Sequence, residues 1–161
     1  MRKFILSLLS LAVAFSCITV ATHGIDVQAS ARAEIAMELS TGTVLTESNA
    51  HARLPMASTT KILTAIIAIE DCNLDEEITV PDAAVGVEGS SIYLQKEEKI
   101  DIRDLLYGLM LRSGNDSAAA LAIHHSGSIE KFAEVMNERA RKIGALSSNF
   151  KNPSRLPDDE H

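Results

Sequence analysis

A serine lies three residues before a lysine at Ser58 and Lys61, where an apolar segment begins. In a helix this spacing places both side chains on one face, one turn apart, so the amine can reach the hydroxyl. Burial in the apolar segment and the positive end of the helix dipole both disfavour the ammonium form and lower the pKa of Lys61 toward that of a usable base. The pair therefore predicts a nucleophilic Ser58 activated by Lys61. A helix-capping Ser58 with an outward Lys61 is the alternative.

The same spacing recurs at Ser128/Lys131 and Ser148/Lys151, so the spacing alone does not identify a site. Lys131 stands near Glu134 on the polar side of an amphipathic pattern, and Ser148 and Lys151 lie in a segment without helical periodicity. Both pairs are typical of solvated surface. Only the pair that includes Lys61 enters an apolar helix.

The tripeptide Ser113-Gly114-Asn115 is a second candidate. The hydroxyl of Ser113 can relay a proton, and the side-chain amide of Asn115 can bind a peptide carbonyl or hold Lys61 in place. Gly114 between these two residues allows a tight bend. A simple turn between two helices has the same composition and is the alternative.

Other chemistries are disfavoured. His124 and His125 are adjacent on a predicted helix and point in different directions, with neither an HExxH motif nor a cysteine pair, so we predict no metal and no cofactor. No GxSxG motif is present, which disfavours an α/β-hydrolase.

The 161 residues include 15 Lys and Arg against 22 Asp and Glu, a net charge of −7, and aromatic residues are 4%. Nucleic acid is therefore not an expected partner.

These candidates need elements to hold them. Alternation over 33–39 and 43–46, on either side of Ser40-Thr41-Gly42, predicts a β-hairpin. The segment 58–70 predicts a helix, and because seven of the eight residues 62–69 are apolar, we expect it to be buried. The acidic, glycine- and serine-containing stretch 71–99 predicts loops and short strands.

Three further helices follow. We predict one after Asp101 through Leu111, one over 117–125 capped by Asp116, and one opened by Ser128 as N-cap and running to Ile143. The candidate tripeptide lies between the first two. The chain is thus a mixed α/β (α+β) protein. Ser58 and Lys61 on one predicted helix, and the tripeptide between two others, carry the candidate chemistry.

The N-terminus predicts export. Arg2 and Lys3 precede an apolar run over 4–21, and small residues follow, which is the layout of a signal peptide over residues 1–29. Cleavage is expected after Ala29 or Ala31, and acylation of Cys17 as a lipoprotein is the weaker alternative. We expect a secreted or extracytoplasmic protein of the cell envelope.

Three segments together resemble one known family. They are Ala57-Ser58-Thr59-Thr60-Lys61, Glu88-Gly89-Ser90-Ser91-Ile92-Tyr93-Leu94, and residues 105–116 with Ser113-Gly114-Asn115-Asp116. From about residue 33 to residue 161 the chain closely resembles the serine D-alanyl-D-alanine carboxypeptidases, the low-molecular-mass penicillin-binding proteins of the peptidase S11 type. Two signature motifs 55 residues apart, as 113 − 58 gives, are more specific than either alone.

The resemblance implies a β-lactamase/transpeptidase-like helical cluster on an antiparallel sheet. It implies that Ser58 is acylated by peptidoglycan pentapeptides ending in D-Ala-D-Ala, with Lys61 as proton acceptor, Ser113 as relay and Asn115 binding substrate. D-alanine leaves, water releases the shortened peptide, and β-lactam antibiotics trap Ser58 as inhibitors.

Two departures from the family pattern stand out. The Lys-Thr-Gly or Lys-Ser-Gly motif is absent from the sequence, and Asn152-Pro153-Ser154-Arg155-Leu156 lacks the glycine of the family's Asn-Pro-x-Gly-Leu. We therefore expect residues 30–161 to be the N-terminal part of the catalytic domain, truncated, with impaired activity and neither the family's C-terminal domain nor its membrane anchor.

Two other functions stay open. The first is a non-catalytic exported protein that binds peptidoglycan or a partner enzyme. The second is a β-lactamase, which ranks low because no glutamate in an ExxLN context is present.

Overall fold

The computed structural model describes residues 31–154, which form two units, one ending at Ala52 and one beginning at Arg53. The predicted signal peptide and residues Arg155 and Leu156 lie outside the described residues. Each unit is considered by itself.

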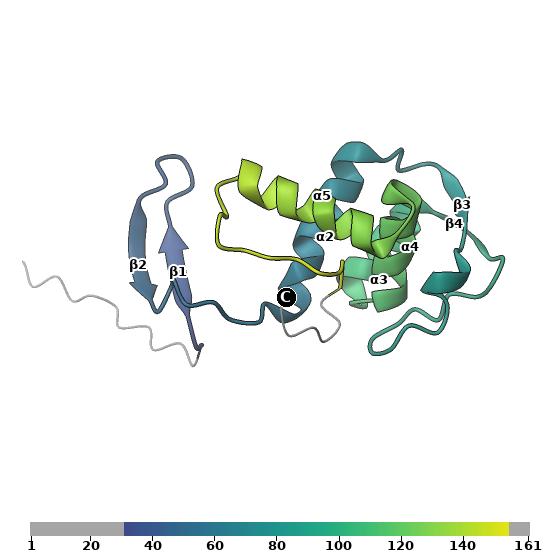
Figure 1. The fold of residues 1–161 in the computed structure, drawn as a ribbon, viewed down its shortest axis with the longest axis horizontal. Helices are drawn as coiled ribbons and strands as arrows, with labels where there is room; N and C mark the ends of the chain where they lie inside the picture. Colours follow the sequence, from purple (N-terminus) through teal and green to yellow (C-terminus); the bar gives the residue numbers. More distant parts are fainter. Residues whose placement is uncertain (1–30, 155–161) are drawn as a thin grey trace, which may run out of the picture. The chain divides into compact units, whose positions relative to one another are not determined.

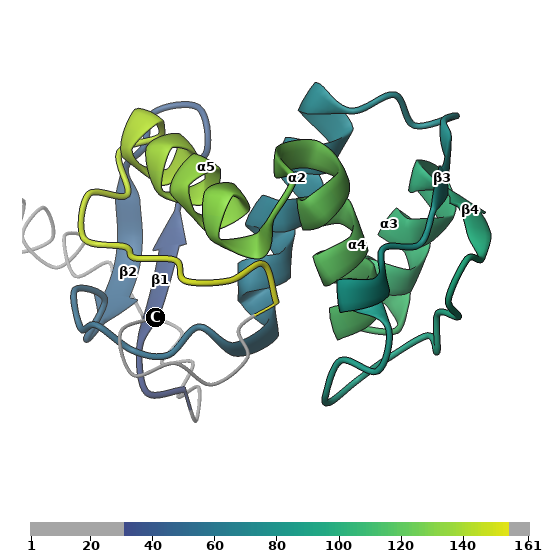
Figure 2. The same cartoon turned by 45° about the vertical axis from the view of Figure 1, so that its right-hand side comes forward.

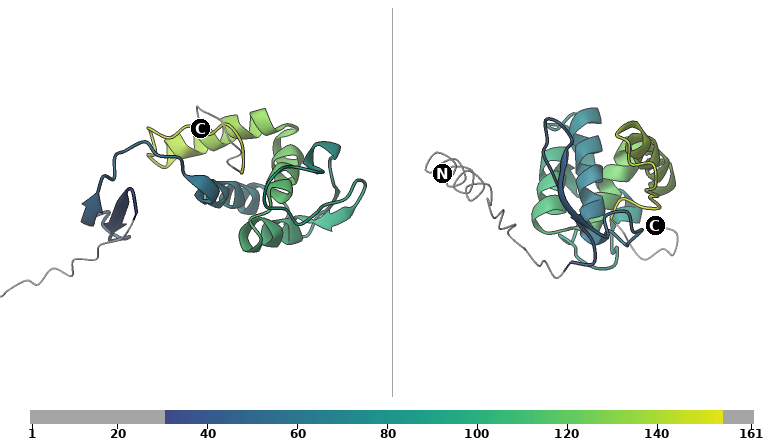
Figure 3. Two further views of the ribbon diagram at one scale, coloured as in Figure 1. Left: turned by 90° about the horizontal axis from the view of Figure 1, so that it is seen from below. Right: turned by 90° about the vertical axis from the view of Figure 1, so that its left-hand side faces the viewer.

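The first unit is a β-hairpin, as the alternation predicted. Strand β1 (Glu34–Met37) pairs antiparallel with β2 (Val44–Ser48), and the register shifts between Ala36 and Met37. Figure 3 shows the two short strands and the turn between them. Gly42 has a φ of 70°, a left-handed conformation that glycine adopts without strain.

The second unit is a cluster of helices with a small two-stranded sheet (Figure 1). Its elements are η1 (Ala57–Thr59), α2 (Thr60–Asp71), β3 (Glu77–Thr79), η2 (Asp82–Ala84), β4 (Lys99–Asp101), α3 (Ile102–Leu111), α4 (Asn115–Ser126) and α5 (Ile129–Lys142). Strands β3 and β4 pair antiparallel and lie on the side of the cluster away from α5 (Figure 2). The mixed α and β content confirms the predicted fold class.

Helix α4 is the centre of this cluster and packs against α2, α3 and α5. Its side chains from Ala118 to Ala122 are all buried. Four of these five residues are alanine, and such small side chains let neighbouring helices approach closely from several sides. Helix α4 therefore forms part of the core between its neighbouring helices.

The C-terminal described segment is held against α2 and α5. Phe150 is buried in a cluster with Ile67, Phe132 and Met136. The side chain of Asn137 exchanges two hydrogen bonds with the backbone of Phe150, both at 2.8 Å. This segment closes one side of the helical cluster.

Three expectations about the elements need correction. The α-helix predicted from residue 58 begins at Thr60, and Ser58 lies in the 3-10 turn η1. Asp116 is not the cap of its helix, because α4 begins at Asn115 after Gly114. Complete burial of 58–70 was also wrong, since one face of α2 exposes about half of Ile62, Ile66 and Ile69.

The cap of α5 follows the prediction, because the Ser128 hydroxyl accepts the N–H of Lys131 at 3.2 Å. Among residues 31–154, no helix is both long and apolar enough to cross a bilayer.

Candidate active site

Two residues at the candidate site have left-handed backbone. Ala57, just before Ser58, has a φ of 49°, and Ser113, between α3 and α4, has a φ of 55°. Residues with side chains rarely adopt this conformation, and it costs on the order of 1 kcal/mol or more at each position. Such strain persists only where the surrounding structure fixes it, and both strained positions lie at or next to a serine of the candidate site.

Three predicted residues meet at this point. The Lys61 Nζ atom donates to the Ser113 carbonyl oxygen at 2.6 Å and to the Ser113 Oγ atom at 2.9 Å. The Ser113 Oγ atom donates to the Ser58 Oγ atom at 3.1 Å. Lys61 therefore reaches Ser58 through the hydroxyl of Ser113. Because hydroxyl hydrogens rotate, the same atoms can also conduct a proton from Ser58 to a neutral Lys61.

The Lys61 amine and the Ser58 hydroxyl lie in different environments. Lys61 is only 4% exposed, whereas Ser58 is exposed to solvent. Burial lowers the pKa of Lys61 below its ordinary value, and the negative charge of Asp116 opposes part of that shift. The arrangement thus places a buried amine with a lowered pKa behind an accessible hydroxyl, a geometry that can activate a serine.

Asn115 lies beside this group but faces a neighbouring segment. Its Nδ2 atom donates to the Glu88 carbonyl oxygen at 2.6 Å, and its backbone N–H donates to Ser90 at 2.7 Å. The side chain is largely buried, with 9% of the residue exposed. The structure therefore places Asn115 next to Ser113, with one of its amide hydrogens committed to the chain itself.

Asp116 is a residue of the site whose contacts the sequence reasoning missed. Its carboxylate is buried and accepts hydrogen bonds from Ser91 Oγ and from three backbone N–H groups. Burial acts to raise the pKa of Asp116, but these hydrogen bonds outweigh it and hold the pKa below the ordinary value. A charged residue directly before an alanine-rich run was the available signal, because a charge near a buried segment requires partners.

The competing candidates lie elsewhere. Ser128 is the cap of α5, and Ser148 and Lys131 are exposed. His125 is 3.4 Å from Asp71 and packs edge-on against Phe132. Among the described residues, no group of three or more His, Cys, Asp or Glu side chains is arranged to hold a metal ion.

Comparison with known proteins gives one family. The family model described as D-alanyl-D-alanine carboxypeptidase (Peptidase_S11) matches residues 19–161. The carboxypeptidase DacF of Bacillus subtilis is 33% identical over 136 residues, a match that covers 81% of this chain and 35% of DacF.

Solved structures agree. The carboxypeptidase DacD of Francisella tularensis superposes with a TM-score of 0.79 at 34% identity, covering 84% of this chain and 34% of that one. Penicillin binding protein 5 of Haemophilus influenzae gives 0.74 at 31% identity, covering 81% and 40%.

The chain spans about a third of the length of DacF and of the Escherichia coli carboxypeptidases DacC and DacD. The family model nevertheless matches most of the chain, and the serine and lysine motifs that carried the resemblance meet in the structure. The chain belongs to the D-alanyl-D-alanine carboxypeptidase family, Peptidase_S11.

Proposed function

We propose that this chain provides the reacting residues of a serine carboxypeptidase that removes the terminal D-alanine from peptidoglycan stem peptides. The observation that carries the proposal is the continuous path from Ser58 through Ser113 to Lys61, with Oγ to Oγ at 3.1 Å and Oγ to Nζ at 2.9 Å. This path joins an exposed nucleophile to a buried base, as acyl transfer to serine requires.

In the proposed first step, the Ser58 oxygen attacks the carbonyl carbon between the two D-alanines. The Ser58 proton passes through Ser113 to Lys61. As the C–N bond breaks, the same path returns a proton to the leaving amine, and free D-alanine departs. The product is an ester between Ser58 and the shortened peptide.

In the second step, water attacks the ester carbonyl and releases the peptide with a new carboxylate. Lys61, again through Ser113, takes the proton of the water and returns one to the Ser58 oxygen. The lowered pKa of Lys61 supports both steps, because only a neutral amine can accept these protons. A β-lactam would acylate Ser58 in the same way and act as an inhibitor.

We assign substrate binding to Asn115. Its amide nitrogen carries two hydrogens, and among the described residues only the bond to Glu88 is formed by this side chain. The second N–H and the carbonyl oxygen can pair with a peptide group of the substrate. Asn115 stands two residues after Ser113, whose hydroxyl donates to Ser58, and this proximity supports a substrate contact near the acylated serine.

We also propose that the protein acts outside the cytoplasm. The support is the charged and then apolar N-terminal sequence with small residues near Ala29, which is typical of a cleaved signal peptide. Peptidoglycan lies in that compartment. Fractionation of cells that carry the tagged chain, with N-terminal sequencing of the product, tests this point.

The experiment for the activity is labelling with a fluorescent penicillin. We expect a covalent label on the wild-type chain, its loss in Ser58→Ala, and its retention in Ser148→Ala, which removes an exposed serine that also stands three residues before a lysine. Release of D-alanine from a D-Ala-D-Ala peptide measures the complete reaction. Wild-type chain that binds isolated peptidoglycan but takes no label would favour the non-catalytic binding protein instead.

A further inference from the structure

One buried carboxylate joins two parts of the chain beside the site. Asp116 is 1% exposed. It accepts the Ser91 hydroxyl at 2.6 Å and the backbone N–H groups of Ile92 and Leu94 at 3.1 Å each. These donors lie 22 to 25 residues earlier in the chain, so the contacts are tertiary rather than part of a helix cap.

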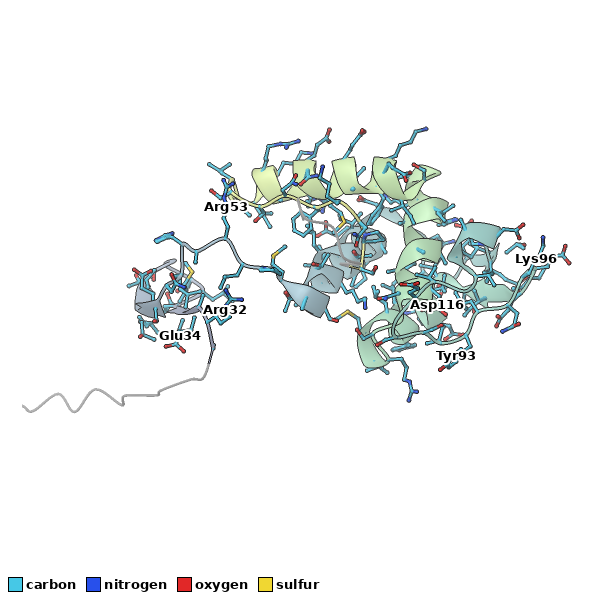
Figure 4. All side chains as sticks on the ribbon, turned by 60° about the horizontal axis from the view of Figure 1, so that its bottom comes forward. Arg32, Glu34, Arg53, Tyr93, Lys96 and Asp116 are labelled. Carbon is cyan, nitrogen blue, oxygen red and sulfur yellow. The ribbon has the colours of Figure 1, made fainter. Side chains whose placement is uncertain are left out.

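We propose, on the basis of the proposed function, that Asp116 is a positioning residue that fixes the segment 88–94 against the start of α4 and thereby holds Asn115 in place for the substrate. Figure 4 shows Asp116 among the helices and Tyr93 on the segment that passes around them. The role is distinct from those of Ser58, Lys61 and Ser113, which exchange protons.

The segment and Asn115 are joined directly. Asn115 donates its backbone N–H to Ser90 and its side-chain N–H to Glu88. The intervening Gly89 has a φ of 88°, and a Cβ atom at this position would lie 2.7 Å from the Asn115 Nδ2 atom. Any displacement of the segment must therefore move the Asn115 amide, which the proposed function uses.

The same segment contains a strained residue. Tyr93 has a φ of 63° and is 78% exposed, so neither its backbone preference nor burial of its ring fixes its conformation. Its backbone N–H donates at 2.8 Å to the Ser91 Oγ atom, which itself donates to Asp116. A strained residue persists where its surroundings hold it, and here the holding group is the Asp116–Ser91 pair.

The charge of Asp116 acts on the base as well. Helix α2, which carries Lys61, packs against η1, α3, α4 and α5. Of the titratable groups on the described parts of these elements, Asp116 of α4 is the one that shifts Lys61, and it raises the pKa that burial lowers. Removing the charge should let the pKa of Lys61 fall further, which increases the neutral fraction of the amine at a given pH.

The test compares three variants of the full chain. Asp116→Asn removes the charge and places an NH2 group against N–H donors, so it should break the anchor. Ser91→Ala keeps the charge and removes only the hydroxyl link, and it remains informative if Asp116→Asn does not fold. Glu134→Gln removes an exposed carboxylate on α5 and is the matched control.

Two readouts are taken on each variant. Amide hydrogen exchange at Ile92 and Leu94 reports the anchor directly. The rate of acylation by benzylpenicillin against pH reports the site, with its binding and chemical steps separated by varying the penicillin concentration.

For Asp116→Asn we expect faster exchange at both amides and acylation slower by about tenfold or more. We also expect the acidic limb of the curve of acylation rate against pH to be displaced to lower pH. For Ser91→Ala we expect faster exchange with the acidic limb unmoved, and for Glu134→Gln no change. A role in stability alone would slow acylation equally at every pH without moving the limb.

The proposal is overturned if exchange at Ile92 and Leu94 is unchanged in Asp116→Asn, or if that variant reacts at the wild-type rate across the pH range. If wild-type chain does not react with penicillin, the proposed function fails separately. The exchange readout needs no acylation, so it still decides whether Asp116 anchors the segment.

Discussion

Lys61 and Ser113 are joined twice, because the lysine Nζ atom donates both to the carbonyl oxygen of Ser113 at 2.6 Å and to its hydroxyl at 2.9 Å. The two residues stand 52 positions apart in the chain. The bond to the Ser113 carbonyl oxygen does not involve the Ser113 side chain. Replacing the Ser113 side chain therefore leaves the lysine tethered while removing its path to Ser58.

This arrangement predicts the effect of Ser113→Ala. Acylation by penicillin should fall by roughly 10²- to 10⁴-fold, the usual contribution of a positioned proton-transfer group. Ser113→Gly is the matched variant, because it removes the same hydroxyl but relieves the left-handed φ of 55°. Equal slowing in both variants would assign the effect to the hydroxyl, whereas recovery of the rate in Ser113→Gly would assign it to the backbone.

A second prediction concerns Gly89 and Gly86. Both have left-handed φ, 88° and 73°, but an added Cβ would meet Asn115 only at Gly89, whereas a Cβ added at Gly86 would meet no neighbouring side chain or backbone within 4 Å. Each alanine substitution should destabilise the protein by about 1 kcal/mol through the backbone. Gly89→Ala should in addition slow acylation.

Chemical denaturation and the acylation rate measure the two effects. If Gly86→Ala slowed acylation as much as Gly89→Ala, the contact with Asn115 would not be the cause.

A third prediction tests the closing segment. Asn137→Ala removes both hydrogen bonds to the Phe150 backbone and leaves its polar groups without those partners. Loss of a satisfied, partly buried pair should lower the free energy of unfolding by about 1–3 kcal/mol. Urea unfolding of Asn137→Ala against Glu138→Ala, an exposed neighbour on α5, measures it. Equal stability of the two variants would contradict a structural role for Asn137.

A fourth prediction concerns the turn of the hairpin. Glu38 accepts hydrogen bonds from the hydroxyls and backbone N–H groups of Thr41 and Ser40, which lower its pKa from 4.5 to about 2. Because the folded pKa is depressed, the carboxylate stabilises the turn above pH 4.5, and this contribution is lost as the pH falls toward 2.

An NMR titration of the Glu38 carboxyl carbon should give a midpoint near 2, with the amide shifts of Ser40 and Thr41 following it. A midpoint near 4.5 would show that the turn is not held by the carboxylate.

The sequence predicted the local parts of the site and could not predict its tertiary contacts. The Ser58 and Lys61 spacing indicated a shared helical face, and the lysine is indeed at the start of α2. The path through Ser113 joins atoms 52 and 55 residues apart, and no local periodicity encodes such a distance.

Asp116 is a second residue whose tertiary contacts the local sequence pattern could not predict. Its position before an alanine-rich helix is typical of a cap, so the pattern predicted one. The donors that it binds instead come from Ser91, Ile92 and Leu94, and their approach depends on how the 71–99 stretch folds back over α4. Tertiary packing thus overrides the local preference.

The most direct test of the account is the titration of Lys61 itself. With lysine Nζ nitrogens isotopically labelled and the Lys61 signal assigned by its absence in Lys61→Arg, the buried amine should titrate with a pKa below the ordinary 10.5. A pKa at or above 10.5 would leave the amine charged and unable to accept the Ser58 proton, and it would contradict the proposed mechanism.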